Sequence, residues 1–209
     1  MGLTAKTGSD LALRNLRYLA RGKRGIASTA RLGRTLVLVK ERNPRSVVDT
    51  VAHEARILAR INAHGLGPRL IRHEPGRLVR EYVDGTLIEA WTAMARPVAI
   101  RCVLAEFLEK CRTLDTIGID KAELTRPFKH LLICRGHPVQ IDYDRARESQ
   151  RPRNVTQACQ FLTSGRYAHL LASCGVVFHK SAIIDAARTY KKEYAARDYA
   201  RLRALVGGN

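Results

Sequence analysis

Hydrophobic periodicity divides the chain into a β-rich first part and a mainly helical second part. In the first part an amphipathic helix is predicted from Ser46 to about His64, and runs typical of strands occupy residues 35–40, 69–71 and 77–83. Beyond Gly85 the apolar residues recur with helical spacing, in a long helix after Pro97 and finally over 181–206. The pattern predicts an α+β protein with two lobes, residues 1–83 and 84–209.

The first predicted helix carries a charge on its apolar face. Ser46 and Asp49 form a start that resembles a capping box, and Glu54 lies at the centre of a stripe formed by Val47, Val51, Leu58 and Ile61. A buried glutamate is costly unless it is paired, so the fold should bring a cation to it. Lys40, which ends the preceding strand, is the nearest candidate. The alternative is an edge position beside Arg56 or Arg60.

One segment of the second part has the composition of strands. Residues 131–134 and 139–141 flank a turn at Gly136-His137-Pro138, which predicts a hairpin. Because a hairpin places its open ends side by side, His130 and Asp142 are expected to share one site. Asp142 and Asp144 also follow a buried strand, where carboxylates are well placed to hold a metal. A solvated acidic turn is the alternative interpretation.

A glycine-containing turn near the N-terminus is a second candidate site. Gly22 and Gly25 lie three residues apart, Ser28 follows, and Lys23 and Arg24 add positive charge. Such a turn can present backbone N–H groups to phosphates. An ordinary hairpin turn explains the same pattern.

Composition narrows the class of protein. The net charge is +18, and residues 1–45 hold eleven basic and two acidic residues, a balance of +9 and thus half of the total. This asymmetry favours an anionic partner such as RNA or a ribonucleoprotein, although a solvated basic surface is the alternative. Five cysteines without a CxxC pair indicate neither a disulfide framework nor a zinc site. With no signal peptide or membrane span recognised, we expect a cytoplasmic protein with no membrane contact.

Taken in chain order, these features resemble the protein-kinase-like superfamily. The features are the glycine turn, a strand ending in Lys40, a helix with an inward Glu54, a connector with Glu81 and a strand ending in Asp142. The likeness extends from about Tyr18 to Gln157 and is closest to small archaeal serine/threonine kinases, which residues 151–157 resemble in particular. RIO-type kinases and lipopolysaccharide-core sugar kinases are more distant. The resemblance implies a bilobed minimal protein-kinase-like fold, with an antiparallel-sheet N-lobe containing one helix and a mainly helical C-lobe.

The resemblance also implies roles for individual residues, with ATP and Mg²⁺ as cofactors. Lys40 would hold the ATP phosphates, and Glu54 would orient its ammonium. Asp142 would bind Mg²⁺. The remaining cofactor-binding positions would be the phosphate-covering turn of Gly22, Gly25 and Ser28, and the adenine-binding backbone of Glu81 to Val83.

The expected catalytic loop departs from the family pattern. Thr125 and His130 stand where the family has a catalytic Asp and a metal-binding Asn, and Thr125 cannot act as a carboxylate base. Asp120, or else Glu123, is therefore the candidate base. His130 and Asn154 are the candidate additional metal ligands, although imidazole suits Mg²⁺ less well than oxygen does.

The resemblance implies an ATP- and Mg²⁺-dependent phosphotransferase similar to serine/threonine protein kinases, acting on an unknown protein substrate or on itself. The alternative is a catalytically degenerate kinase-fold protein that binds nucleotide or RNA as a scaffold. A slow ATPase switch is a further alternative.

Overall fold

The computed structural model describes residues 12–22, 24–46 and 48–208, which form two units. Described residues up to Val83 form the first unit together with Asp142–Arg145, and Asp84–Ile141 and the residues from Ala146 onward form the second. The first change of unit thus falls between Val83 and Asp84, where the hydrophobic period changes. Residues 142–145, which the sequence assigned to the second lobe, belong to the first unit instead, because they contact its helix and sheet.

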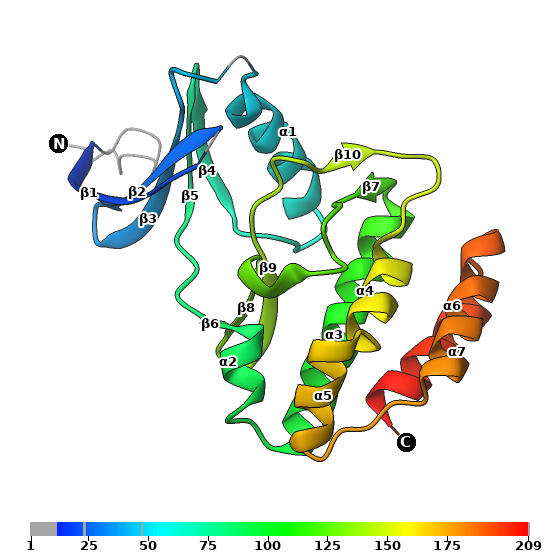
Figure 1. Cartoon of the computed structure of the whole chain (residues 1–209). Coiled ribbons are helices and arrows are strands. Elements are labelled where there is room, and N and C mark those ends of the chain that lie inside the picture. Colours follow the sequence, from blue (N-terminus) through cyan, green and yellow to red (C-terminus); the bar gives the residue numbers. More distant parts are fainter. Residues whose placement is uncertain (1–11, 23, 47, 209) are drawn as a thin grey trace, which may run out of the picture. The chain divides into compact units, whose positions relative to one another are not determined.

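The first unit is built on a five-stranded antiparallel sheet within the described residues (Figure 1). Its strands lie in the order β1-β2-β3-β5-β4. The elements are β1 (Leu13–Arg21), β2 (Gly25–Leu32), β3 (Thr35–Arg42), α1 (Thr50–Asn62), β4 (Leu70–Glu74) and β5 (Arg77–Glu81). This sheet, followed by a mainly helical region, confirms the predicted α+β class. Of the residues before β1, those up to 11 lie outside the described part.

The two faces of this sheet have different roles. In the β3–β5 pairing Leu38 lies opposite Arg80, and Lys40 lies opposite Leu78, so these four side chains share the face that α1 covers. The other face carries a small apolar cluster of Ala30, Leu32, Val37, Val39 and Val79. Alternation along the strands therefore separates a charged face from an apolar one.

Helix α1 begins later than the sequence suggested. Asp49, rather than Ser46, is the N-cap, and its carboxylate accepts hydrogen bonds from the N–H groups of Val51 and Ala52. The Ser46 hydroxyl instead donates to the carbonyl of Val48. Val51, Leu58 and Ile61 are fully buried, as the periodicity predicted, whereas Val47 lies outside the described residues.

The second unit packs helices around α3 (Figure 1). Apart from short strands β6 (Thr86–Leu87), β7 (Ile119–Asp120) and β10 (Arg147–Glu148), it contains the predicted hairpin of β8 (Leu131–Cys134) and β9 (His137–Gln140). Its helices are α2 (Ile88–Thr92), α3 (Pro97–Thr116), the 3-10 helix η1 (Pro127–Lys129), α4 (Asn154–Leu162), α5 (Gly165–Ser173), α6 (Lys180–Glu193) and α7 (Ala196–Gly207). No helix among the described residues has the length and apolar character needed to cross a bilayer.

The segment 181–206 is helical, as predicted, but it is divided into two helices, α6 and α7. Tyr194 ends α6 with a left-handed backbone (φ 54°), and α7 begins two residues later. The break is held by long-range hydrogen bonds. The Tyr194 hydroxyl donates to the Pro152 carbonyl (2.7 Å), and Arg112 donates to the Tyr194 carbonyl (2.7 Å).

Gly67 provides a test of packing in the first unit. It has a φ of +68°, and a Cβ at this position would lie 2.9 Å from Ile61 Cδ1 and 3.2 Å from Tyr143 Cε2. Gly65 has the same φ but nothing within 4 Å of its Cβ position, so it is a matched control. We expect Gly65→Ala to cost roughly 1–2 kcal/mol of unfolding free energy through backbone strain. Gly67→Ala should cost about 1–3 kcal/mol more because of overpacking.

Urea denaturation of both variants measures this difference. Equal shifts of the midpoint would show that Tyr143 does not pack on Gly67 as described.

Candidate functional site

Lys40 is positioned by the strands on either side of it. It lies in β3, opposite Ala27 of β2 and Leu78 of β5. A Cβ on Gly25 would lie 3.3 Å from Lys40 Cε and 3.2 Å from the Glu41 carbonyl oxygen. Gly25 therefore leaves room for the lysine stem to pass under the start of β2, which is a packing reason for glycine here.

The Lys40 ammonium lies between two carboxylates. Its Nζ donates to Glu54 Oε2 at 2.5 Å and to Asp142 Oδ1 at 3.0 Å. Burial lowers the pKa of Lys40, but the charges of Glu54 and then Asp142 outweigh burial, so the pKa lies above its usual value. Lys40 is thus a fixed cation at neutral pH. The predicted pairing of Lys40 with Glu54 is present, and the alternative placing of Glu54 at a frayed edge is wrong, since Glu54 is 1% exposed.

Asp142 and Tyr143 are tied to α1 through Glu54. The backbone N–H of Tyr143 donates to Glu54 Oε1 at 3.4 Å, and the Tyr143 ring is buried against Gly67. Asp142 has a left-handed backbone with φ 60°. Backbone strain of this kind persists only where the surroundings impose it, and it is concentrated at functional sites. Asp144, two residues on, forms an ion pair with Arg24 at 3.4 Å.

Arg80 is a second buried cation, which the sequence analysis missed. It is 5% exposed, and its Nη1 donates to the Glu81 carbonyl, while its Nε is buried without a hydrogen-bond partner among the described residues. Burial lowers the pKa of Arg80, against the attraction of Glu54 and Asp142. The signal was available, because Arg80 follows Leu78 by two residues and so shares its inward face. Two cations, Lys40 and Arg80, therefore balance the carboxylates Glu54 and Asp142.

The glycine turn differs from its prediction. Only residues 22–24 connect β1 and β2, and Ser28 lies within β2, paired with Val39. Alternation places the buried Ser28 on the opposite face of the sheet from Lys40, so it does not line the site that Lys40 faces. The Gly22 N–H is also committed, since it donates to the Gly25 carbonyl at 2.8 Å. Lys23 lies outside the described residues.

The predicted adenine-binding connector begins at the end of β5. The Glu81 N–H donates to the Arg69 carbonyl (2.8 Å), and the Glu81 carbonyl accepts from Arg80. Val83 lies in a segment without regular structure, from 82 to 85. The backbone groups of Glu81 are therefore already engaged within the protein.

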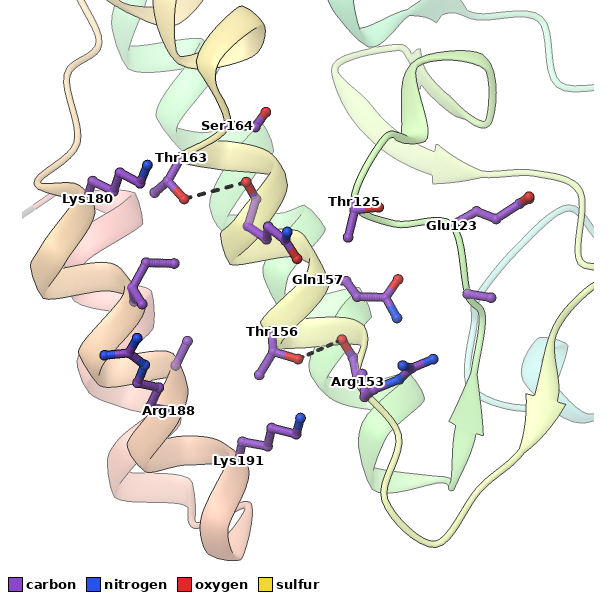
Figure 2. Close-up of a pocket in the computed structure, with 14 residues that line it drawn as sticks. Glu123, Thr125, Arg153, Thr156, Gln157, Thr163, Ser164, Lys180, Arg188 and Lys191 are labelled. Carbon is purple, nitrogen blue, oxygen red and sulfur yellow. Dashed lines mark hydrogen bonds between the residues drawn. The ribbon is translucent and has the colours of Figure 1, made fainter.

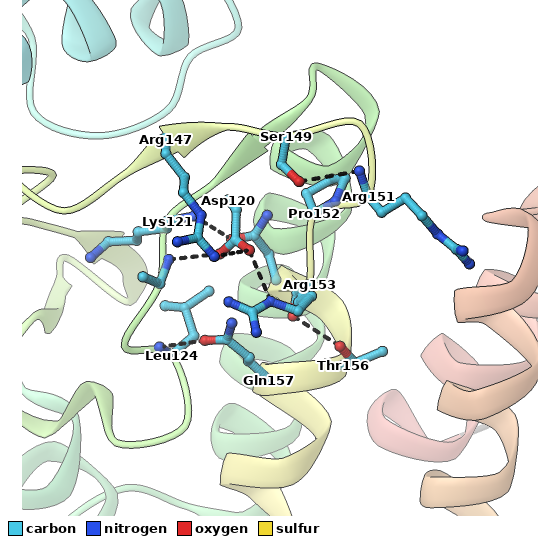
Figure 3. A network of polar contacts seen from close by, with 12 residues as sticks. Asp120, Lys121, Leu124, Arg147, Ser149, Arg151, Pro152, Arg153, Thr156 and Gln157 are labelled. Atoms are coloured by element: carbon cyan, nitrogen blue, oxygen red, sulfur yellow. Dashed lines mark hydrogen bonds and ion pairs between the residues drawn. The ribbon is translucent and has the colours of Figure 1, made fainter.

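Asp120, the predicted base, belongs to the second unit and is 1% exposed. Figure 3 shows its carboxylate beside Arg147 and Arg153. Its Oδ1 accepts from the Ala122 N–H at 3.0 Å, and its Oδ2 pairs with Arg153 at 3.0 Å and Arg147 at 3.8 Å. Ala122 and Glu123, two and three residues after Asp120, both have positive φ angles, 61° and 55°. Asp120 thus stabilises a strained loop, and its carboxylate is held by two arginines.

Asn154, a predicted metal ligand, has a structural role instead. It is fully buried, its Oδ1 accepts from the Lys121 N–H (2.8 Å), and its Nδ2 donates to Asp115 Oδ1 (2.8 Å) and to the Ile119 carbonyl (2.6 Å). These bonds occupy the amide, so the structure does not support metal binding by Asn154. His130 also belongs to the second unit, where its carbonyl accepts from the Ile141 N–H.

Asp142 offers one carboxylate of the kind that Mg²⁺ prefers, and one of its oxygens already accepts from Lys40. A hard cation prefers carboxylate and phosphate oxygens, and Mg²⁺ is usually held by one or two carboxylates together with substrate phosphates. In the described part of the chain, no three or more His, Cys, Asp or Glu side chains are grouped to hold a metal ion. Phosphate oxygens would therefore have to complete the coordination of a metal at Asp142.

Comparison with known proteins assigns no family. No model of a known protein family matches this sequence, and no curated protein is similar to it at a significant level. Functional inference therefore rests on the residues themselves.

The buried charge cluster yields a stability prediction. Glu54→Gln removes the central carboxylate and leaves the buried cations with Asp142 alone, so we expect a loss of about 3–5 kcal/mol of unfolding free energy. Glu41→Gln is the matched control, because Glu41 pairs with Arg77 at 2.6 Å on the same sheet but both side chains are partly exposed. This control should lose less than about 1 kcal/mol. Urea denaturation measures both, and equal losses would contradict the central role of Glu54.

The Asn154 network yields a second prediction. Asn154→Asp removes the two amide donors and places a carboxylate beside Asp115, so stability should fall by about 3 kcal/mol. Adding Mg²⁺ should not restore the melting temperature. A variant that melts like the parent chain and binds Mg²⁺ more tightly in calorimetry would instead establish Asn154 as a metal ligand.

Proposed function

We propose that this protein is an ATP- and Mg²⁺-dependent phosphotransferase with a bilobed protein-kinase-like fold. The observation that carries the proposal is Lys40, held between Glu54 and Asp142 on one face of an antiparallel sheet. Phosphoryl transfer needs mainly positioning and charge neutralisation. A lysine aimed by a buried glutamate, beside a carboxylate suited to a metal, provides both.

In this proposal each residue of the cluster has a separate task. Lys40 binds the phosphates of ATP, and Glu54 keeps its ammonium in place. Asp142 holds Mg²⁺, which would neutralise the charge of the phosphates when bound. Of the predicted connector, the backbone of Val83 would contact adenine, since that of Glu81 is engaged. The acceptor would be a serine or threonine hydroxyl of a protein substrate or of the chain itself.

The environment of Asp120 favours a second candidate function, in which the protein binds nucleotide without transferring phosphate. A base must reach the proton that it abstracts. The Asp120 carboxylate is buried and paired with Arg153 and Arg147. The same chain could then bind RNA, since β1 exposes Arg14, Arg17 and Tyr18. Such binding would weaken steeply as salt rises.

Labelling with γ-³²P-ATP and Mg²⁺, combined with calorimetry of Mg·ATP binding, tests the proposal. We expect the parent chain to bind Mg·ATP and to transfer label. Lys40→Ala and Asp142→Asn should each reduce transfer by a factor of about 100 or more. Lys40→Ala removes a cation that binds the phosphates, and Asp142→Asn removes the carboxylate that holds Mg²⁺. Glu41→Gln, on the same strand as Lys40, should label like the parent chain.

Binding of Mg·ATP without transfer by the parent chain would support the second candidate. Transfer that is unchanged in both Lys40→Ala and Asp142→Asn would refute the proposed site.

A further inference from the structure

An open cavity of about 880 Å³ lies within the second unit. None of the four buried or paired charges of the first unit, Lys40, Glu54, Arg80 and Asp142, lines it. Figure 2 shows it between α4 and α6, bordered by the loop that contains Glu123 and Thr125. We call this space the α4–α6 groove. The α4 side and the loop after it contribute hydroxyl and amide groups, from Thr156, Gln157, Gln160, Thr163 and Ser164.

The groove is strongly basic. Four cations line it, namely Arg153, Lys180, Arg188 and Lys191, against a single acid, Glu123. Arg153 is paired with Asp120, and Arg188 with Asp185. Lys180 and Lys191 make no ion pair with any residue in the described part of the chain. An anionic ligand would therefore gain two cations that have no competing partner.

Helix geometry places these two lysines on one face. They are eleven residues apart on α6, which corresponds to a separation of about 16 Å along the axis and a rotation of only about 20°. In Figure 2 both side chains extend from α6 toward α4. Lys192, the next residue, lies about 100° around the helix and does not line the groove.

This spacing and lining select among anionic ligands. A separation of about 16 Å lies between four and six residues of extended peptide, and these even spacings place two side chains on the same side of the chain. Single-stranded nucleic acid is normally bound by aromatic side chains on which bases stack, and the groove lining contains none.

The hydroxyls of Thr156, Thr163 and Ser164 already donate to backbone carbonyls, so they can only accept from a ligand. The Gln157 Oε1 accepts from the Leu124 N–H, which leaves its amide nitrogen to donate, and the Gln160 amide can do both. Such groups suit a peptide main chain, which both donates and accepts hydrogen bonds.

We infer that the α4–α6 groove binds an extended acidic segment of a partner protein, with two acidic side chains, four or six residues apart, on Lys180 and Lys191. This inference does not depend on phosphate transfer.

Fluorescence anisotropy with the full chain tests the inference. The probes are labelled twelve-residue peptides with two glutamates four or six residues apart, and their glutamine counterparts are the peptide controls. Lys191→Glu should weaken binding of the acidic peptides about tenfold, and Lys192→Glu, with the same change of charge, less than threefold. The double variant Lys180→Glu/Lys191→Glu should instead bind the corresponding lysine peptides, provided that its melting temperature matches that of the parent chain.

Two results would overturn the inference. One is equal weakening by Lys191→Glu and Lys192→Glu, which would mean that only net charge matters. The other is binding of a twelve-nucleotide oligouridine or of inorganic polyphosphate that depends on Lys180 and Lys191, while the acidic peptides do not bind.

Discussion

The pairing of one buried carboxylate organises the first unit. Glu54 is 1% exposed, and an unpaired charge at that depth would cost several kcal/mol. One of its oxygens accepts a hydrogen bond from Lys40 of the sheet. The other accepts from the N–H of Tyr143, which is 89 residues away in the sequence. Helix, sheet and returning segment therefore meet at a single side chain. The position of Asp142, next to Tyr143, follows from this meeting.

The parts of this arrangement that could be predicted are those set by local periodicity. The stripe on α1 placed Glu54 inside, and the cost of burial required a cation, which Lys40 provides. Strand alternation would also have identified Arg80 and excluded Ser28 from the charged face, but the sequence analysis treated the glycine turn as reaching Ser28. The residue at which the turn ends and β2 begins is set by the pairing of β2 with β3. A turn motif does not reveal that pairing.

Long-range hydrogen bonds determine the roles of several residues in the second unit, and no pattern in the sequence reveals these bonds. Asn154 is held by Asp115 and by the backbone of residues 119–121, so its amide serves the fold. Tyr194 breaks a helix whose composition continues across it, because Arg112 and Pro152 bind that residue. Partners 33 to 82 residues apart leave no local pattern. The role of Asp120 is likewise set by its ion pairs with Arg147 and Arg153, which its position after α3 does not reveal.

The membership of residues 142–145 in the first unit affects how the protein is made. During synthesis the sheet and α1 are made before Tyr143. The ring and the N–H of Tyr143 complete the packing against Gly67 and Glu54. The first unit therefore reaches its final structure only after residues 84–141 of the second have been synthesised. A fragment that ends at Val83 would leave part of the Glu54 carboxylate and the apolar surface beneath Tyr143 uncovered during synthesis, when chaperones recognise exposed apolar surface.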